Sequence, residues 1–110
     1  MATLSDRHDC LTVMVTFECS TEQQAALADK VRAYISDFIS QQPGLISSHL
    51  HLSLCGTRVV NYAQWRSMDD FKAFGEKARL RPELPALLAY KPKAVFYRVD
   101  FSVEDEGSGL

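Results

Sequence analysis

A chain of 110 residues has room for one domain with a single hydrophobic core. Hydrophobic residues make up 46% of it and charged residues 24%, which excludes a disordered or fibrous chain. The formal net charge of −2 lacks the basic excess of proteins that bind nucleic acids or anionic membranes, so we expect neither partner.

Residues 1–10 contain no apolar segment, and we expect a flexible N-terminus there. The β-branched and aromatic run from 11 to 17 predicts a first strand. A helix follows, capped by Ser20 or Thr21, each with a glutamine three residues later in the capping-box position. Its apolar stripe at helical spacing consists of Leu27, Ala28, Val31, Ile35, Phe38 and Ile39.

A Pro-Gly pair ends that helix, and residues 45–54 and 57–65 then predict two strands. Between them Cys55 and Gly56 predict a two-residue hairpin turn, which sets the register of the two strands. The pairs expected on the more apolar face, which we assign to the helix side, are Leu54 with Thr57, Leu52 with Val59, Leu50 with Asn61, Ser48 with Ala63 and Ile46 with Trp65. The pairs expected on the opposite face are His49 with Tyr62, His51 with Val60 and Ser47 with Gln64.

A second helix begins after Ser67, its expected cap, with Asp69 and Asp70 in a first turn that favours negative charge. Phe71 and Phe74 lie one turn apart on its buried side.

Two prolines set apart a short helical piece around residues 84–89, and residues 93–101 predict a fourth strand. We expect the domain to span residues 11–102, followed by an acidic, disordered tail at 103–110. The order β-α-β-β-α-β predicts an α+β, ferredoxin-like antiparallel sheet with both helices on one face. The other face is left uncovered, which makes a homodimer plausible.

Asn61 is a polar residue on an otherwise apolar face, and an unpaired buried amide costs about 1–3 kcal/mol. It is therefore bonded either to backbone or buried water, or to a ligand. Trp65 lies two residues further on the same face, where it is either a core residue or an aromatic wall of a site. Together the two residues suit an apolar, oxygen-bearing ligand between sheet and helices.

Other polar residues allow weaker interpretations. Lys77, Arg79 and Arg81 form either a solvated cap at a helix C-terminus or a mouth that attracts an acidic substrate. His49 and His51 are expected as an interface pair or a solvated pair, because no third residue is spaced to complete a metal site. No phosphate loop, catalytic triad, paired carboxylates or dinucleotide fingerprint is present.

Cysteine usage bears on the compartment. The chain contains three cysteines, an odd number, without the spacing of a zinc site or a disulfide framework. We therefore expect no structural metal and a cytoplasmic protein. No apolar run approaches the ~20 residues that a membrane-spanning helix needs.

The run from Asn61 to Phe71 (Asn-Tyr-Ala-Gln-Trp-Arg-Ser-Met-Asp-Asp-Phe) resembles the antibiotic biosynthesis monooxygenase domain, and in particular the small anthrone-oxidising monooxygenases of aromatic polyketide pathways. The wider Gly-Thr-x-Val-Val-Asn-Tyr-Ala-Gln-Trp run at 56–65 and the Pro-Lys-Ala-Val-Phe run at 92–96 add to the resemblance, which spans residues 11–101.

The resemblance implies a homodimeric α+β barrel with a pocket in each subunit. It also implies oxidation of a phenolic or anthrone-type substrate to a quinone by O2, without flavin, haem or metal. Asn61 and Trp65 would be catalytic, binding a carbonyl oxygen and steadying the enolate and peroxide. We expect the substrate to be bound by Leu50, Leu52, Phe71, Phe74, Arg79 and Arg81.

Two positions depart from the family pattern. Some members have a tyrosine where Phe71 stands. They also have an arginine after the second helix, and in this chain either Arg79 or Arg81 fills that place. Haem-degrading relatives need a histidine on the second helix, and residues 67–91 contain none. A quinol monooxygenase and a dimeric module that binds a small ligand without turnover remain as alternatives.

Overall fold

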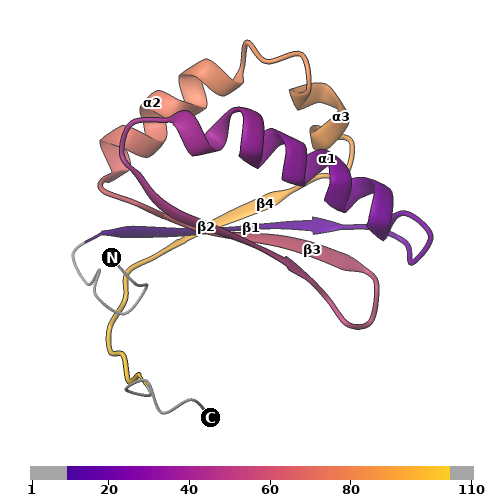
Figure 1. Cartoon of the computed structure of the whole chain (residues 1–110), viewed down its shortest axis with the longest axis horizontal. Coiled ribbons are helices and arrows are strands. Elements are labelled where there is room, and N and C mark those ends of the chain that lie inside the picture. Colours follow the sequence, from indigo (N-terminus) through magenta and orange to yellow (C-terminus); the bar gives the residue numbers. More distant parts are fainter. Residues whose placement is uncertain (1–9, 105–110) are drawn as a thin grey trace.

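The computed structural model describes residues 10–104, whose four antiparallel strands form one sheet with the helices packed on one face (Figure 1). The strands are β1 (Leu11–Glu18), β2 (Leu45–Leu52), β3 (Arg58–Trp65) and β4 (Lys93–Tyr97), in the spatial order β2-β3-β1-β4. The helices are α1 (Gln24–Asp37), the 3₁₀ turn η2 (Ile39–Gln41), α2 (Met68–Ala78) and α3 (Leu84–Leu88). The predicted α+β, ferredoxin-like fold is confirmed. Of the flexible terminus predicted for 1–10 and the acidic tail predicted for 103–110, residues 1–9 and 105–110 lie outside the described residues, and Cys10 is buried.

Of the two predicted caps, only Ser67 before α2 is confirmed. The Gln23 amide donates to Ser20 Oγ (3.2 Å), and the Ser20 amide donates to Gln23 Oε1 (2.9 Å), but these hydrogen bonds close a turn that precedes α1, whose N-cap is Gln23 and has no side-chain cap hydrogen bond. At α2 the Asp70 amide donates to Ser67 Oγ at 3.1 Å. The prediction is therefore right for the start of α2, whereas the N-cap of α1 lies three residues after Ser20.

The hairpin turn between β2 and β3 is longer than the predicted two residues. The strands end at Leu52 and begin again at Arg58, because Ser53 Oγ accepts the amides of Thr57 (3.2 Å) and Arg58 (2.9 Å). The prediction that Leu54 faces Thr57 on the helix side is wrong, since the Leu54 side chain is fully exposed. The predicted pairing of residues 47–52 is nevertheless confirmed, because the wider loop keeps the same register.

A bulge changes the other end of the hairpin. Trp65 pairs with Leu45 instead of the predicted Ile46, because the register shifts between Leu45 and Ser47. β4 is also shorter than predicted and ends at Tyr97, since its pairing with β1 ends there at Thr12, next to the beginning of β1.

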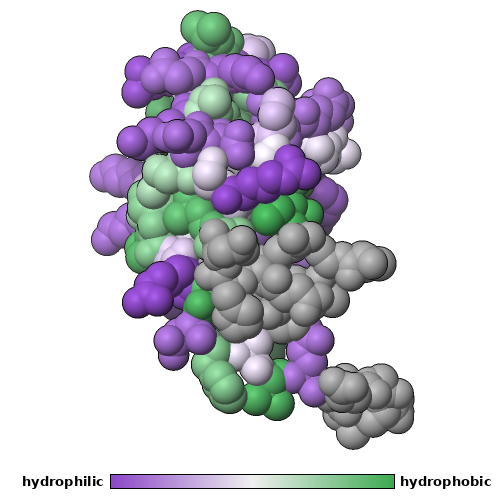
Figure 2. All heavy atoms as spheres, turned by 90° about the vertical axis from the view of Figure 1, so that its left-hand side faces the viewer, coloured by the Kyte–Doolittle hydropathy of each residue, from purple (hydrophilic) through white to green (hydrophobic). Residues whose placement is uncertain are grey.

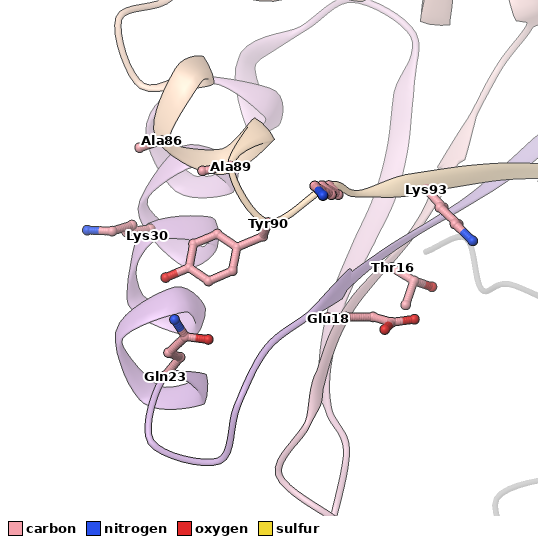
Figure 3. A pocket seen from close by; sticks show the side chains of 9 residues that line it. Thr16, Glu18, Gln23, Lys30, Ala86, Ala89, Tyr90 and Lys93 are labelled. Atoms are coloured by element: carbon pink, nitrogen blue, oxygen red, sulfur yellow. The ribbon is translucent and has the colours of Figure 1, made fainter.

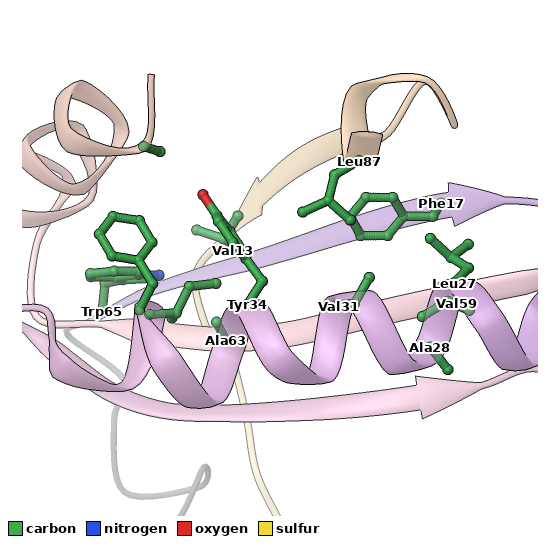
Figure 4. Packing of buried hydrophobic residues seen from close by; sticks show 13 residues of the cluster. Val13, Phe17, Leu27, Ala28, Val31, Tyr34, Val59, Ala63, Trp65 and Leu87 are labelled. Carbon is green, nitrogen blue, oxygen red and sulfur yellow. The ribbon is translucent and has the colours of Figure 1, made fainter. Parts of the chain in front are cut away.

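The core lies between the sheet and α1. The buried side chains of α1 point towards β1 and β3, and Leu87 of α3 reaches down onto the same layer (Figure 4). Ile35 is only partly buried, whereas Tyr34 is buried with 7% of its surface exposed. The buried residues of the segment 24–41, which holds α1, its C-cap Phe38 and η2, are Leu27, Ala28, Val31, Tyr34, Phe38 and Ile39.

The outer surface is divided unevenly. Seen from the left-hand side of Figure 1, hydrophilic side chains cover most of the helical layer, and hydrophobic surface gathers in the middle and at the lower end of the molecule (Figure 2). In the part of the chain from 10 to 104, no helix is long and apolar enough to span a membrane.

Substitution by alanine is expected to change the stability of the protein in opposite directions at two glycines. Gly44 has φ +89°, and an added Cβ would collide with the Asp70 side chain. We expect Gly44→Ala to lower the free energy of unfolding by about 2 kcal/mol or more, since left-handed backbone alone costs an alanine about 1–2 kcal/mol.

Gly75→Ala is the matched control. Nothing lies within 4 Å of a Cβ at Gly75 in α2, so alanine should raise the free energy of unfolding by about 0.5–1 kcal/mol through helix propensity. Urea denaturation measures both changes. Equal stability of Gly44→Ala and the unaltered protein would contradict the described turn.

Candidate functional site

A cavity of about 160 Å³ lies between the sheet and the helices. Its walls come from β1, β3, all three helices and η2. The lining residues are Val13, Val15, Phe17, Val31, Tyr34, Ile39, Asn61, Ala63, Trp65, Phe71, Phe74, Ala78, Leu84, Leu87, Leu88 and Pro92. The cavity is therefore almost wholly apolar, and its few polar atoms decide what it can bind.

Asn61 is buried, and only one end of its carboxamide has a partner within residues 10–104. Ser48 Oγ donates to Asn61 Oδ1 at 2.7 Å from the neighbouring strand β2. The Nδ2 group makes no hydrogen bond with the described residues. The described residues thus leave the Asn61 N–H donors open to a ligand.

Trp65 is both core residue and aromatic wall. Only 1% of its surface is exposed. Its ring centroid lies 5.1 Å from that of Phe74 and 5.6 Å, edge to face, from that of Phe71. Phe71 in turn contacts Phe96 of β4 at 5.4 Å. The indole N–H has no acceptor among residues 10–104, so it is a second unused donor at the cavity.

Tyr34 is a cavity residue that the sequence interpretation missed. It lies one turn after Val31 and one turn before Phe38, so the helical spacing contained the signal. Its ring packs against Phe38 at 5.4 Å, and its hydroxyl has no hydrogen bond with any described residue. Burial raises the pKa of Tyr34, with a smaller contribution from Glu83 opposed by Arg81, which keeps the phenol protonated at neutral pH.

Of the predicted site residues, the structure brings Asn61, Trp65, Phe71 and Phe74 together around the cavity. The other four do not line it, although we expected them to. Leu50 packs against the core beside the cavity, and Leu52 is 46% exposed near the hairpin. Arg79 lies on the surface, 4.0 Å from Glu76.

Arg81 is close to the cavity without lining it. Its guanidinium carbon lies 4.7 Å from the centroid of Phe38, and its NH2 group is 2.6 Å from Glu83 Oε2. The hydrogen bond from Arg81 is the main reason that the pKa of Glu83 is lowered. The two residues form a neutralised ion pair next to Tyr34.

A second, wider cleft of about 780 Å³ opens at the edge of the sheet, outside the cavity (Figure 3). Tyr90 and Lys30 lie on one side of it, and Thr16, Glu18 and Lys93 lie on the other. Its polar side chains are exposed or half-buried, unlike the buried donors of the cavity. We therefore place the candidate site in the cavity.

The open face of the sheet carries the two predicted histidines. Both are exposed, and His51 lies 6.4 Å from Tyr62, ring to ring. Within residues 10–104, no group of three or more histidine, cysteine or acidic residues is placed to hold a metal ion.

Comparison with known families gives one match over most of the chain. The model described as "Antibiotic biosynthesis monooxygenase" matches residues 10–81. The tetracenomycin-F1 monooxygenase of Streptomyces glaucescens is 39% identical over 103 residues, which cover 93% of this chain and 92% of that protein.

Solved structures show the same fold. A Streptomyces coelicolor monooxygenase from the gene ActVA-Orf6, in complex with nanaomycin D, has a TM-score of 0.77 and 29% identity over 96% of this chain and 100% of that one. SnoaB, a cofactor-independent oxygenase from Streptomyces nogalater, has a TM-score of 0.72 over 88% of this chain and 99% of that one; at 21% identity this likeness concerns the fold alone.

Cys55, at the hairpin turn and outside the cavity, allows a test of the local geometry. Its Sγ lies 3.0 Å from Thr57 Oγ1 and 3.5 Å from Ser53 Oγ, and these hydrogen bonds lower its pKa to about 7. We expect the rate of alkylation by iodoacetamide to reach half its plateau near pH 7, because only the thiolate reacts.

Mass spectrometry locates the label, which should appear on exposed Cys55 before buried Cys10. Ser53→Ala removes the larger contribution and should move the midpoint upward. A midpoint near the ordinary thiol value of about 8.5 in the unaltered protein would contradict the described turn.

Proposed function

The chain belongs to the antibiotic biosynthesis monooxygenase family, and we propose that it oxidises a phenolic or anthrone-type aromatic of a polyketide pathway to a quinone with O2 and no cofactor. Its relatives support the pathway, since the protein that is 39% identical acts as a tetracenomycin-F1 monooxygenase. The Streptomyces coelicolor relative holds nanaomycin D.

The observation that carries the proposal is a set of unused donors in an apolar cavity. The Asn61 amide, the Trp65 indole and the Tyr34 hydroxyl all offer N–H or O–H groups, and none of them has an acceptor among residues 10–104. A ligand that fits must therefore supply oxygen acceptors on an apolar frame. A phenolic or anthrone-type aromatic has both properties.

The same donors favour the reacting form of such a substrate. Loss of a proton from the anthrone CH2 group gives an enolate, whose oxygen accepts stronger hydrogen bonds than the neutral carbonyl. The enolate passes one electron to O2, the two radicals combine, and the peroxide collapses to the quinone carbonyl with release of water. One O2 thus converts CH2 to C=O and gives one H2O, so the substrate itself is the reductant.

The cofactor-free chemistry rests on the residues of the site and on the family. The cavity residues named above include no histidine, cysteine or carboxylate that could ligate a metal. We further propose that the protein works in the cytoplasm.

A second candidate is a module that binds such a ligand without turnover. The same lining supports it, because the described cavity residues include no imidazole or carboxylate to accept the substrate proton. Oxygen uptake separates the two candidates.

Asn61→Ala tests the site directly. We expect enzyme-dependent O2 uptake on anthrone, and quinone formation, to fall about tenfold or more, because the variant loses a donor to the enolate. An enzyme-free sample corrects for spontaneous oxidation, and circular dichroism checks the fold.

Ser48 provides the matched pair. Ser48→Ala leaves Asn61 Oδ1 without its donor and should lower turnover, whereas Ser48→Thr keeps the hydroxyl and should restore it. An unchanged rate in Asn61→Ala would remove Asn61 from the mechanism.

The homodimer that the resemblance implies belongs to the same proposal. The open face and β4 expose apolar side chains, with Val95 at 47% and Tyr97 at 48%. Val60 and Tyr62 are half-buried on the same face. Such a surface is usually covered, and here we propose a second copy of the chain.

Light scattering at micromolar concentration should give twice the chain mass of 12.4 kDa. Val95→Lys should shift the mass towards the monomer, since it buries a charge in the interface. Ala73→Lys, at an exposed position on α2, is the control and should remain dimeric. A monomeric mass for the unaltered protein would overturn the dimer.

A further inference from the structure

The cavity is smaller than the substrate proposed for it. Sites for drug-sized ligands usually measure about 300–1,000 Å³, and this one measures about 160 Å³. A fused aromatic of several rings cannot lie wholly inside it. If the proposed substrate class is right, part of the molecule must therefore be held in an adjoining space.

Such a space lies directly beside the cavity. A groove of about 250 Å³ runs between α1 and α3, bordered by Lys30, Ala33, Tyr34, Glu83, Ala86 and Leu87. Two of these residues, Tyr34 and Leu87, also line the cavity. Their side chains are thus the partition between the buried space and the groove.

The partition carries a polar group that the fold does not use. Tyr34 rises from α1 with its hydroxyl directed away from the helix, and Leu87 points down from α3 (Figure 4). The Tyr34 hydroxyl has no hydrogen-bond partner among residues 10–104. The hydroxyl oxygen keeps some accessible surface, so a ligand in the groove can reach it.

The charges at the groove suit an oxygen-bearing ring. Glu83 Oε2 is paired with Arg81 at 2.6 Å, which offsets the charge of the carboxylate, and Glu83 Oε1 is buried without a hydrogen-bond partner among the described residues. Lys30 stands on the opposite wall without an ion pair among the described residues. The groove therefore offers one free cation and one phenol to a ligand oxygen.

We propose that the groove between α1 and α3 is a second part of the substrate site, which holds the outer ring of a fused polycyclic phenol or quinone, and that the Tyr34 hydroxyl donates a hydrogen bond to an oxygen of that ring system. A change of the Tyr34 rotamer joins the two spaces. This inference rests on the proposed function only for the class of the substrate.

Blocking the groove tests its role without touching the cavity. Ala33 is exposed and lines the groove alone, so Ala33→Phe should fill it. Ala26→Phe places the same side chain at an exposed position of α1 that borders neither space. Binding is measured by calorimetry, and by the fluorescence of Trp65, the one tryptophan of the chain.

Two probes of different length give the contrast. For alizarin, a dihydroxyanthraquinone of three fused rings, we expect Ala33→Phe to raise Kd by roughly tenfold. For α-naphthol, with two rings, the change should stay below about twofold. Ala26→Phe should leave both values unchanged. If Ala33→Phe and the unaltered protein bind alizarin with equal affinity, the groove is not part of the substrate site.

Tyr34→Phe tests the donor while keeping the ring. It should raise Kd for alizarin about fivefold, the loss expected for one neutral hydrogen bond, whereas Tyr90→Phe in the lysine-bordered cleft should have no effect. An unchanged Kd in Tyr34→Phe would remove the hydroxyl from recognition.

These outcomes are independent of turnover. Tight binding with no O2 uptake would overturn the proposed oxygenase and leave the groove intact. Normal turnover on anthrone, together with no effect of Ala33→Phe on alizarin binding, would overturn the groove and leave the proposed oxygenase intact.

Discussion

A carboxamide buried in an apolar wall has two ends to satisfy, and residues 10–104 provide a partner for only one end of Asn61. Ser48 on β2 donates a hydrogen bond to Asn61 Oδ1, so the N–H groups of Asn61 point away from Ser48. That arrangement depends on the pairing of β2 with β3, because Ser48 and Asn61 meet as diagonal neighbours on one face. The register of β2 and β3 thus decides both how Asn61 is buried and which of its groups remains free for a ligand. The helices that cover this face of the sheet complete the cavity.

Much of this could be predicted from the sequence because alternation in a strand has a period of two. The predicted turn at Cys55 and Gly56 is too short, yet the five-residue loop between the strands keeps residues 47–52 in their predicted register and on their predicted faces. The error therefore left Asn61 and Trp65 correctly placed. The bulge near Leu45 was not predictable in this way, since an extra residue in one strand leaves no mark on the pattern of hydrophobic residues.

The residues that sequence reasoning misplaced are those whose position depends on packing between distant elements. Tyr34 shares the spacing of the apolar stripe, but its contact with the cavity depends on how α1 lies against α3. Arg81 belongs to a connection without a repeating pattern, and only the fold places it over Phe38. Arginine and leucine side chains assigned to the site by resemblance lie outside the cavity for the same reason.

The apolar lining has a consequence for the second reactant. Cavities walled by aliphatic and aromatic side chains tend to stay dry and to accept small apolar guests. Dioxygen is such a guest. Like the side chains that line the cavity, it is apolar and dissolves better in apolar surroundings than in water, so its concentration in the cavity exceeds that in the surrounding water. Dryness also slows the escape of a charged, partly reduced oxygen species, because leaving requires it to cross a low-dielectric wall before water can solvate it.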